Sequence, residues 1–414
     1  MIIDSVKYDG LCTCGREHRM ATKFSIVESG CLKNIKEYLS RFNLSGYTVA
    51  VYDENTYRAT ADRHPEADLE VILCPDDLHA NEHGVDALMK ELPECAELLL
   101  AVGSGTVHDI TRYCAYQRAI PFVSCPTAAS VDGFCSSVAA MTWHGCKKTL
   151  EAVAPTIVVA DTDVIKNAPV RLARSGIGDM IGKFIALSDW RIANAIKGEF
   201  FCDRIAEMTM QATRTVLDTA EGILAGDESF YENLMYGLLL SGLAMQMMGN
   251  SRPASGAEHH ISHIIEMAPP SLGVSSDALH GEKVGVGTLM ALAEYKRIVS
   301  ECVPVRDYTP FYSDHVLSIF GDGMAKEILE ENANDAASGV TLDMLSSAMP
   351  RIKEIIDELP SPVGLADTYR RIGMKSQLSD IDVSDAVAPK LLDCSPLVRS
   401  RLTLMRLRKC FEVK

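Results

Sequence analysis

Three of the eleven histidines fall within five positions, in the stretch AEHHISHIIEM. Residues four apart share one face of a helix, so this spacing makes His259 and His263 neighbours, while His260 points about 100° away. Imidazoles on one helix face can bind a divalent metal, transfer protons near neutral pH, or simply pack in a core. Three clustered histidines favour a functional site over a structural one.

Two further stretches hold residues that could join the same site. GIGDMIGK places Asp179 after two glycines, and ALHGEKVGVG places His280 at the start of a predicted helix. One carboxylate and two imidazoles, with a fourth position left open, are the ligand set of a catalytic divalent metal. Spacing alone favours His259 and His263 as the imidazole pair. The structural alternative for Asp179 is a helix cap.

A glycine-rich stretch, AVGSGTVHD, follows an apolar run and opens a predicted helix. Gly103 and Gly105 allow the backbone to approach a ligand, and the amides of a helix N-terminus favour a phosphate. His108 occupies the third glycine position of the dinucleotide fingerprint, so an ordinary tight turn is equally compatible. Asp53, after an earlier apolar run, can accept hydrogen bonds from a ribose hydroxyl or cap a helix.

A run of small residues precedes two polar ones in SCPTAASVDGFCSS. Small side chains allow a flat ring to lie against the backbone, and Asp132, followed by Ser136, can hold substrate hydroxyls. Taken by itself, the stretch favours the alternative of a solvated loop.

The secondary structure predicted to position these residues changes near Pro169. Before it, helical stretches such as ANEHGVDALMKEL separate short runs rich in Val, Ile and Leu, a pattern that predicts a parallel, doubly wound sheet covered on both faces. After it come long segments with apolar residues three and four apart, which predict helices. We therefore expect an α/β domain over 1–170 and a helical domain over 171–414. The predicted strands span residues 47–53, 69–74, 97–103, 120–126 and 156–162.

The composition is that of an ordinary globular protein, with 47% hydrophobic and 23% charged residues and a net charge of −16. The negative charge argues against nucleic acid and anionic membranes as partners. Thirteen scattered cysteines suit a reduced, cytoplasmic protein. The N-terminal stretch lacks the features of a signal peptide, and the longest uncharged stretch, 233–251, predicts a buried helix instead of a membrane span. CTCG with His18 could begin a metal knuckle, but no second cysteine pair follows at finger-like spacing.

Six motifs occur in a fixed order over roughly residues 25 to 300: GSGTVHDITRY, PTAASVDGFCSS, APTIVVADTDVI, GIGDMIGK, SGAEHHISHIIEM and LHGEKVGVGT. Together they resemble the sn-glycerol-1-phosphate dehydrogenases, part of the superfamily of iron-containing alcohol dehydrogenases, glycerol dehydrogenases and dehydroquinate synthases. The resemblance implies an N-terminal Rossmann-like domain with a parallel sheet, followed by an all-α domain. It also implies a homodimer, NAD or NADP as cofactor, and one divalent metal: zinc, nickel or iron.

Carried over residue by residue, the resemblance implies a role for each motif. The metal ligands are Asp179, His259 and His280, while His263 faces the substrate, which replaces the pairing that spacing favours. Substrate contacts come from Asp132, Asp179 and His263, with Asp132 and His263 as catalytic residues. NAD contacts come from Asp53, Gly105, Thr106, Val107, His108, Asp109, Thr127, Ala128, Ala129, Ser130 and Ser136.

The activity so implied is the interconversion of sn-glycerol 1-phosphate and dihydroxyacetone phosphate by hydride transfer. A glycerol dehydrogenase acting on unphosphorylated polyols and a dehydroquinate-synthase-like lyase are the alternatives. One carboxylate and two imidazoles suit zinc, nickel or iron alike. Asp53 favours NAD over NADP without deciding between them. Lys148 in GCKKT is a candidate ligand for the substrate phosphate, with a solvated lysine as the alternative.

Overall fold

The computed structural model describes residues 1–76, 78–143 and 146–413 and divides into two compact units. Unit 1 comprises Met1–Met180 and Arg214–Asn250, and unit 2 comprises Ile181–Thr213 and Ser251–Lys414. Both units are therefore built from two separate stretches of chain.

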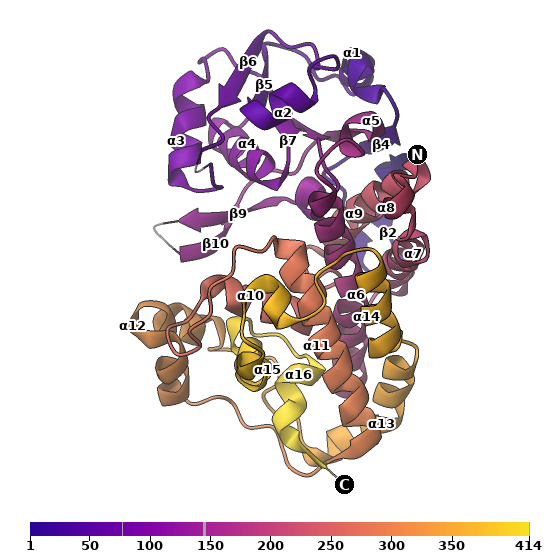
Figure 1. Ribbon diagram of the computed structural model, residues 1–414, viewed down its shortest axis with the longest axis vertical. Coiled ribbons are helices and arrows are strands. Elements are labelled where there is room, and N and C mark those ends of the chain that lie inside the picture. Colours follow the sequence, from indigo (N-terminus) through magenta and orange to yellow (C-terminus); the bar gives the residue numbers. More distant parts are fainter. Residues whose placement is uncertain (77, 144–145, 414) are drawn as a thin grey trace. The chain divides into compact units, whose positions relative to one another are not determined.

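Unit 1 contains a seven-stranded sheet of order β1-β4-β11-β8-β7-β5-β6 (Figure 1). Its edge strand β1 pairs antiparallel with β4, and the other neighbours are parallel. The five apolar runs form five of these strands, which confirms the expected parallel sheet, while β1 and β4 were not predicted. The strands are β1 Ile2–Asp4, β4 Phe24–Glu28, β5 Thr48–Asp53, β6 Leu69–Leu73, β7 Leu98–Gly103, β8 Phe122–Pro126 and β11 Ile157–Asp161.

Alternate residues of one strand enter two different apolar cores. Val49 and Val51 of β5 pack in a cluster with residues of α3 and α4, whereas Ala50 and Tyr52 pack in another cluster with residues of α1. Burial on both faces explains why this strand is an apolar run. The remaining elements of this half are α1 Ile35–Arg41, α2 Glu54–Ala59, α3 Glu82–Glu91, α4 Gly105–Arg118, α5 Thr162–Ile165 and the hairpins β2 Gly10–Leu11 with β3 Glu17–His18 and β9 Val138–Trp143 with β10 Cys146–Glu151.

Helices make up most of the chain after residue 170, as expected (Figure 1). The stretch AEHHISHIIEM forms α10 over its whole length and packs along α11. Their bounds are α6 Val170–Lys197, α7 Asp203–Thr219, α8 Gly222–Ala225, α9 Glu228–Met248, α10 Ala257–Met267, α11 His280–Glu301, α12 Ser313–Glu331, α13 Leu342–Asp357, α14 Pro362–Arg371, α15 Ala388–Cys394 and α16 Leu404–Leu407, with a hairpin of β12 Cys302–Pro304 and β13 Phe411–Val413.

A buried carboxylate on α6 ties three other helices of unit 2 to it. Asp189 of α6 accepts hydrogen bonds from the Tyr295 hydroxyl of α11 (2.7 Å) and from the Leu404 amide of α16 (2.8 Å). It also accepts one from the Ala257 amide at the start of α10 (3.0 Å). These bonds fix the N-terminal end of the helix that carries the clustered histidines.

The compact units differ from the predicted domains 1–170 and 171–414, which remain a prediction. Helix α9 belongs to unit 1 because it packs against β4 and against the short 3-10 turn Gly133–Cys135. The apolar stretch that forms α9 is nearly all buried there, as expected. Within the described part of the chain, no helix is both long and apolar enough to cross a bilayer.

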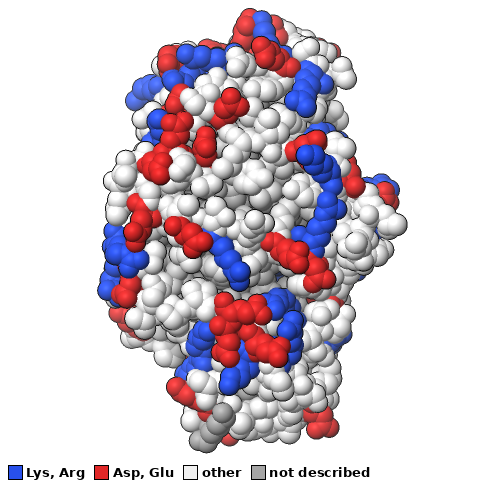
Figure 2. Space-filling view, turned by 90° about the vertical axis from the view of Figure 1, so that its right-hand side faces the viewer, with Lys and Arg blue, Asp and Glu red and all other residues white. Residues whose placement is uncertain are grey.

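Acidic and basic side chains lie next to one another on the face of the molecule shown in Figure 2. Ion pairs between exposed residues, such as Arg351 with Glu354 and Arg58 with Glu54 (both 2.8 Å), have the same character. Pairs of this kind contribute at most about 1 kcal/mol each, so the fold depends on its cores.

Candidate active site

The glycine-rich stretch forms the turn between β7, which ends at Gly103, and α4, which begins at Gly105. A Cβ added to Gly103 would lie 2.5 Å from the Cβ of Val107, so only glycine fits there. The first amide bonded within the helix is that of His108, to the Ser104 carbonyl (3.1 Å). The three preceding amides, of Gly105, Thr106 and Val107, donate to none of the described residues. This arrangement suits a phosphate.

The His108 side chain is part of the core of unit 1. Its Nδ1 lies 2.9 Å from the Ser104 carbonyl oxygen and its Nε2 lies 2.8 Å from the Ser124 hydroxyl. Burial, together with the nearby Arg112 guanidinium, lowers the pKa of His108 to about 3, so the ring is neutral. The backbone of His108, and not its side chain, therefore remains predicted to contact the cofactor.

His108 makes stability sensitive to acid. Its pKa in the folded state lies below the ordinary value of 6.5, so as pH falls from 6.5 towards 3 only the unfolded chain takes up this proton and stability declines. Between pH 7 and pH 5 we expect this group alone to cost about 2 kcal/mol. Urea unfolding of the wild type and of His108→Gln measures the free energy of unfolding at both pH values. The difference between the two proteins should be smaller at pH 5 than at pH 7 by this amount. An equal difference at both pH values would mean that the folded protein protonates His108 normally.

Arg112 joins α4 to the loop that follows β8. Its guanidinium is buried and donates to the carbonyl oxygens of Gly133 (2.7 Å) and Val138 (3.0 Å) and to Oδ1 of Asp109 (3.2 Å). Sequence inspection alone gave no role to this arginine.

Arg112→Lys should lower the free energy of unfolding by about 2 kcal/mol or more. A lysine ammonium lacks the forked donors of a guanidinium and cannot reach both carbonyl oxygens. Each buried carbonyl left unpaired costs about 1–3 kcal/mol. Thermal unfolding is the measurement, and Arg118→Lys is the matched control, because Arg118 of the same helix is partly exposed and bonds one carbonyl, that of Leu92. Equal losses in the two variants would contradict this role.

The small residues after β8 are buried, so the solvated-loop alternative is wrong for Thr127 to Ser130. The Thr127 amide donates to the Gly103 carbonyl (3.0 Å), which joins this segment to the glycine turn. The Ser130 carbonyl accepts from the Ser175 hydroxyl (3.2 Å), and a Cβ added to Gly176 would lie 2.1 Å from the Ala129 carbonyl oxygen. The segment is thus a packed wall beside the glycine turn.

Asp132 and Asp179 lie in contact in unit 1. The Asp132 amide donates to Oδ2 of the fully buried Asp179 (2.9 Å), and the Asp132 carboxylate accepts from the Ser241 hydroxyl of α9 (2.8 Å). The Ser136 hydroxyl donates to the Val138 carbonyl (2.8 Å) and accepts from the Val138 amide (3.1 Å). The motif after β8 and the start of α6 are thereby brought together, although 47 residues separate the two aspartates.

Asp53 ends β5 and caps α2. Its Oδ1 accepts hydrogen bonds from the amides of Asn55 (2.8 Å) and Thr56 (2.9 Å), in a capping box. The capping alternative is therefore confirmed. Because both bonds use Oδ1, Oδ2 is left for a ribose, and that contact remains a prediction.

The rings of His259, His263 and His280 form a cluster within unit 2. Their centroids are 5.3 Å apart for His259 and His280, 5.8 Å for His259 and His263, and 5.9 Å for His263 and His280. Ligand atoms of His259 and His280 lie within 4.8 Å of each other, and no such group among the described residues holds both His259 and His263. His260 is buried on another side, and burial lowers its pKa well below the ordinary value.

Two carboxylates that sequence reasoning missed orient these rings. Oε1 of the fully buried Glu258 lies 2.6 Å from Nδ1 of His259, and Oε1 of Glu266 lies 2.9 Å from Nδ1 of His280. Burial alone would raise the pKa of Glu266, but His280, His263 and Lys283 hold it well below its usual range. In the sequence, Glu258 and Glu266 could have been found as the acidic residues at either end of an otherwise apolar, histidine-rich helix.

His263 is the histidine of the cluster that stays without a carboxylate partner at hydrogen-bond distance among the described residues. Burial, reinforced by His259 and His280, lowers its pKa to about 3, although Glu266 acts in the opposite direction. Its ring is therefore neutral near pH 7.

The chain is similar to known proteins over most of its length. The model of the iron-containing alcohol dehydrogenase family matches residues 26–169. A glycerol-1-phosphate dehydrogenase [NAD(P)+] of Bacillus licheniformis is 32% identical over 96% of this chain and 92% of its own length. The chain belongs to the glycerol-1-phosphate dehydrogenase family. A family member from Pyrococcus furiosus is 41% identical over 46% of this chain and 54% of its own length.

Solved structures share the fold of the family at low identity. A probable glycerol dehydrogenase from Sinorhizobium meliloti 1021 superimposes with a TM-score of 0.61 at 18% identity, covering 93% of this chain and 94% of its own. A 1,3-propanediol oxidoreductase gives a TM-score of 0.62 at 15% identity, covering 94% of this chain and 96% of its own. These likenesses confirm the expected fold class.

Proposed function

We propose that the protein interconverts sn-glycerol 1-phosphate and dihydroxyacetone phosphate with NAD or NADP. The observation that carries the proposal is the pair His259 and His280, each held by a carboxylate at Nδ1 in a chain of the glycerol-1-phosphate dehydrogenase family. A ring that donates its Nδ1–H to a carboxylate keeps the lone pair of Nε2 for a cation. Two imidazoles prepared in this way fit a divalent metal.

Asp179 is the third metal ligand in this proposal. It is a fully buried carboxylate, and carboxylate oxygens are common ligands of divalent metals.

The cofactor is assigned to the turn after β7 and the packed wall after β8. The free amides before His108 suit the pyrophosphate, Oδ2 of Asp53 suits a ribose hydroxyl, and the small residues from Thr127 to Ser130 suit the nicotinamide. Ser136 would border the same ring. Hydrogen bonds from Arg112 and Thr127 keep these segments in position before the cofactor binds.

In the oxidation, C2 of glycerol 1-phosphate loses a hydride to the nicotinamide and its hydroxyl loses a proton. A bound divalent cation supplies Lewis-acid polarisation of the substrate oxygen. His263 is assigned to relay the proton released by the substrate hydroxyl, because an imidazole can both accept and donate a proton, and Asp132 is suited to bind a substrate hydroxyl. The candidate phosphate ligand Lys148 lies exposed on β10, opposite Met141, and its role remains a prediction.

The proposal is tested by following NADH and NADPH oxidation by the purified protein with dihydroxyacetone phosphate, before and after chelation. We expect activity that chelation abolishes, and enzymatic analysis of the product identifies the sn-1 isomer. Activity with dihydroxyacetone and none with its phosphate would point to a glycerol dehydrogenase. Inactivity with every small ketone would overturn the proposal, and a dehydroquinate-synthase-like lyase reaction would then be assayed.

The identity of the metal, the homodimer and the cytoplasmic location also remain predictions. Elemental analysis of the purified protein identifies the metal. The mass of the protein in solution shows whether it is a dimer.

A further inference from the structure

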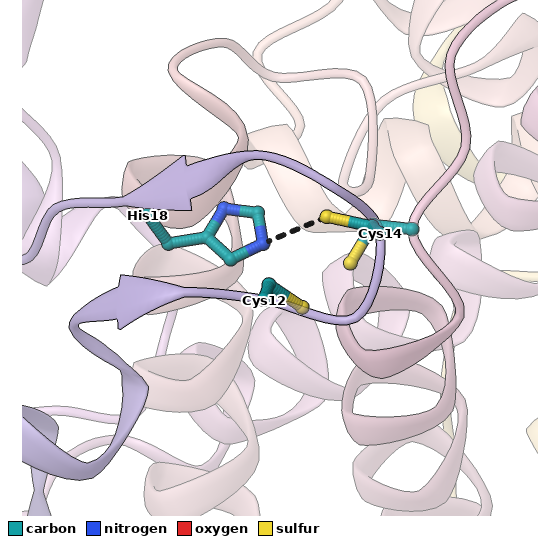
Figure 3. A group of neighbouring side chains, drawn as sticks. Cys12, Cys14 and His18 are labelled. Atoms are coloured by element: carbon teal, nitrogen blue, oxygen red, sulfur yellow. Dashed lines mark hydrogen bonds between the residues drawn. The ribbon is translucent and has the colours of Figure 1, made fainter.

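A short hairpin in unit 1 gathers two cysteines and a histidine (Figure 3). Strands β2 and β3 pair antiparallel for two residues each, with Gly10 opposite His18. The turn between them closes through two backbone hydrogen bonds, from the Gly15 amide to the Cys12 carbonyl and from the Cys12 amide to the Arg16 carbonyl, both 2.9 Å. Gly15 has φ +83°, which favours glycine and allows the chain to fold back within three residues.

The turn directs three metal-binding side chains at one point. Cys12, Cys14 and His18 each offer a ligand atom within 4.8 Å of the others, and Sγ of Cys14 lies 3.4 Å from Nε2 of His18. Cys12 is 6% and His18 is 2% exposed, so these polar atoms are withdrawn from water. A hairpin with strands this short has little core of its own to balance that cost.

The histidine is held in the form that a metal requires. Its Nδ1 lies 2.7 Å from the Met247 carbonyl oxygen at the end of α9, so Nδ1 carries the proton and donates it. The lone pair on Nε2 therefore faces the cysteine sulfurs, as in metal-bound histidines whose other nitrogen donates to a carbonyl.

We propose that Cys12, Cys14 and His18 bind a structural zinc ion, separate from the catalytic metal. Two thiolates and one imidazole favour zinc over magnesium, calcium or manganese. The spacing C-x-C-x3-H explains why no second cysteine pair is needed, because the returning strand supplies the histidine.

The site is placed to stabilise the end of α9. Directly after the hairpin, the amides of Ala21 and Thr22 donate to Oε1 of Gln246 (3.0 and 3.1 Å), and Nε2 of Gln246 donates to the Cys135 carbonyl (2.5 Å). Zinc binding by the hairpin would therefore support the loop that follows Asp132, without touching substrate.

Titration of the metal-free full-length protein with Co²⁺ tests the site. We expect an intense near-ultraviolet absorption from thiolate-to-cobalt charge transfer, to which aspartate and histidine ligands contribute nothing. Its intensity counts the thiolates and so identifies the remaining ligand. The double variant Cys12→Ser/Cys14→Ser should lose this absorption and about one zinc per chain while keeping the metal that His259→Ala removes.

Cys95→Ser, at an exposed cysteine, is the matched control and should keep both the band and the zinc. If the double variant fails to fold, the spectrum and zinc content of the intact protein decide. Absence of the charge-transfer band in the intact protein, or a disulfide between Cys12 and Cys14 after purification without reductant, would overturn the proposal. These readouts do not depend on turnover, so failure of the proposed dehydrogenase activity is distinguished from failure of the zinc site.

Discussion

His259→Ala should remove one equivalent of tightly bound metal per chain, whereas His263→Ala should keep the metal and lose turnover. The reason is that Glu258 holds Nδ1 of His259 and leaves Nε2 for the ion, while His263 has no such partner among the described residues. Loss of a group that transfers the proton typically lowers turnover about 100- to 10,000-fold. Elemental analysis and steady-state kinetics on the same preparations measure both effects.

His315→Ala is the matched control, because His315 is an exposed histidine on α12, outside the cluster. It should retain both metal and activity. Loss of metal in both His259→Ala and His263→Ala would restore the pairing that their four-residue spacing favours. Unchanged metal in His259→Ala would remove this histidine from the ligand set.

Glu258→Gln and Glu266→Gln should each weaken metal binding about 10- to 100-fold. Glutamine nearly preserves the shape of each side chain but removes the negative charge that faces Nδ1 of His259 or His280. The imidazole then becomes a poorer donor to the ion. Competition between the protein and a chelator of known affinity measures the change.

Glu301→Gln, at the exposed C-terminal end of α11, is the control for removing one negative charge from the same unit and should leave affinity unchanged. If Glu258→Gln and Glu266→Gln both leave the metal affinity unchanged as well, the two carboxylates serve only packing. A loss in Glu258→Gln alone would mean that His280 is not a ligand.

The sequence by itself was sufficient for the elements with strong periodicity. Four of the five apolar runs became central strands, β5, β7, β8 and β11, because a parallel sheet is buried on both faces, whereas the fifth became the edge strand β6. Helix α10 coincides with the histidine-rich stretch. Strands β1 and β4 were missed, since β1 is a three-residue edge strand and β4 is held by pairing with β11. The domain limits predicted from the sequence pattern differ from the compact units. The reason is that α9 packs against β4, although about 200 residues separate them in the chain.

The types of the site residues were also readable from sequence, but their partners were not. Nothing local indicates that Arg112 bonds Gly133 and Val138, that the Asp132 amide meets Asp179, or that Glu266 holds His280 across a turn between helices. His18 could be judged a ligand only once Met247, 229 residues later, was seen to accept from its Nδ1. The sequence determined which chemistry the chain can carry, and the tertiary structure decided which atoms face one another, because hydrogen bonds depend on distances in space that spacing along the chain does not contain.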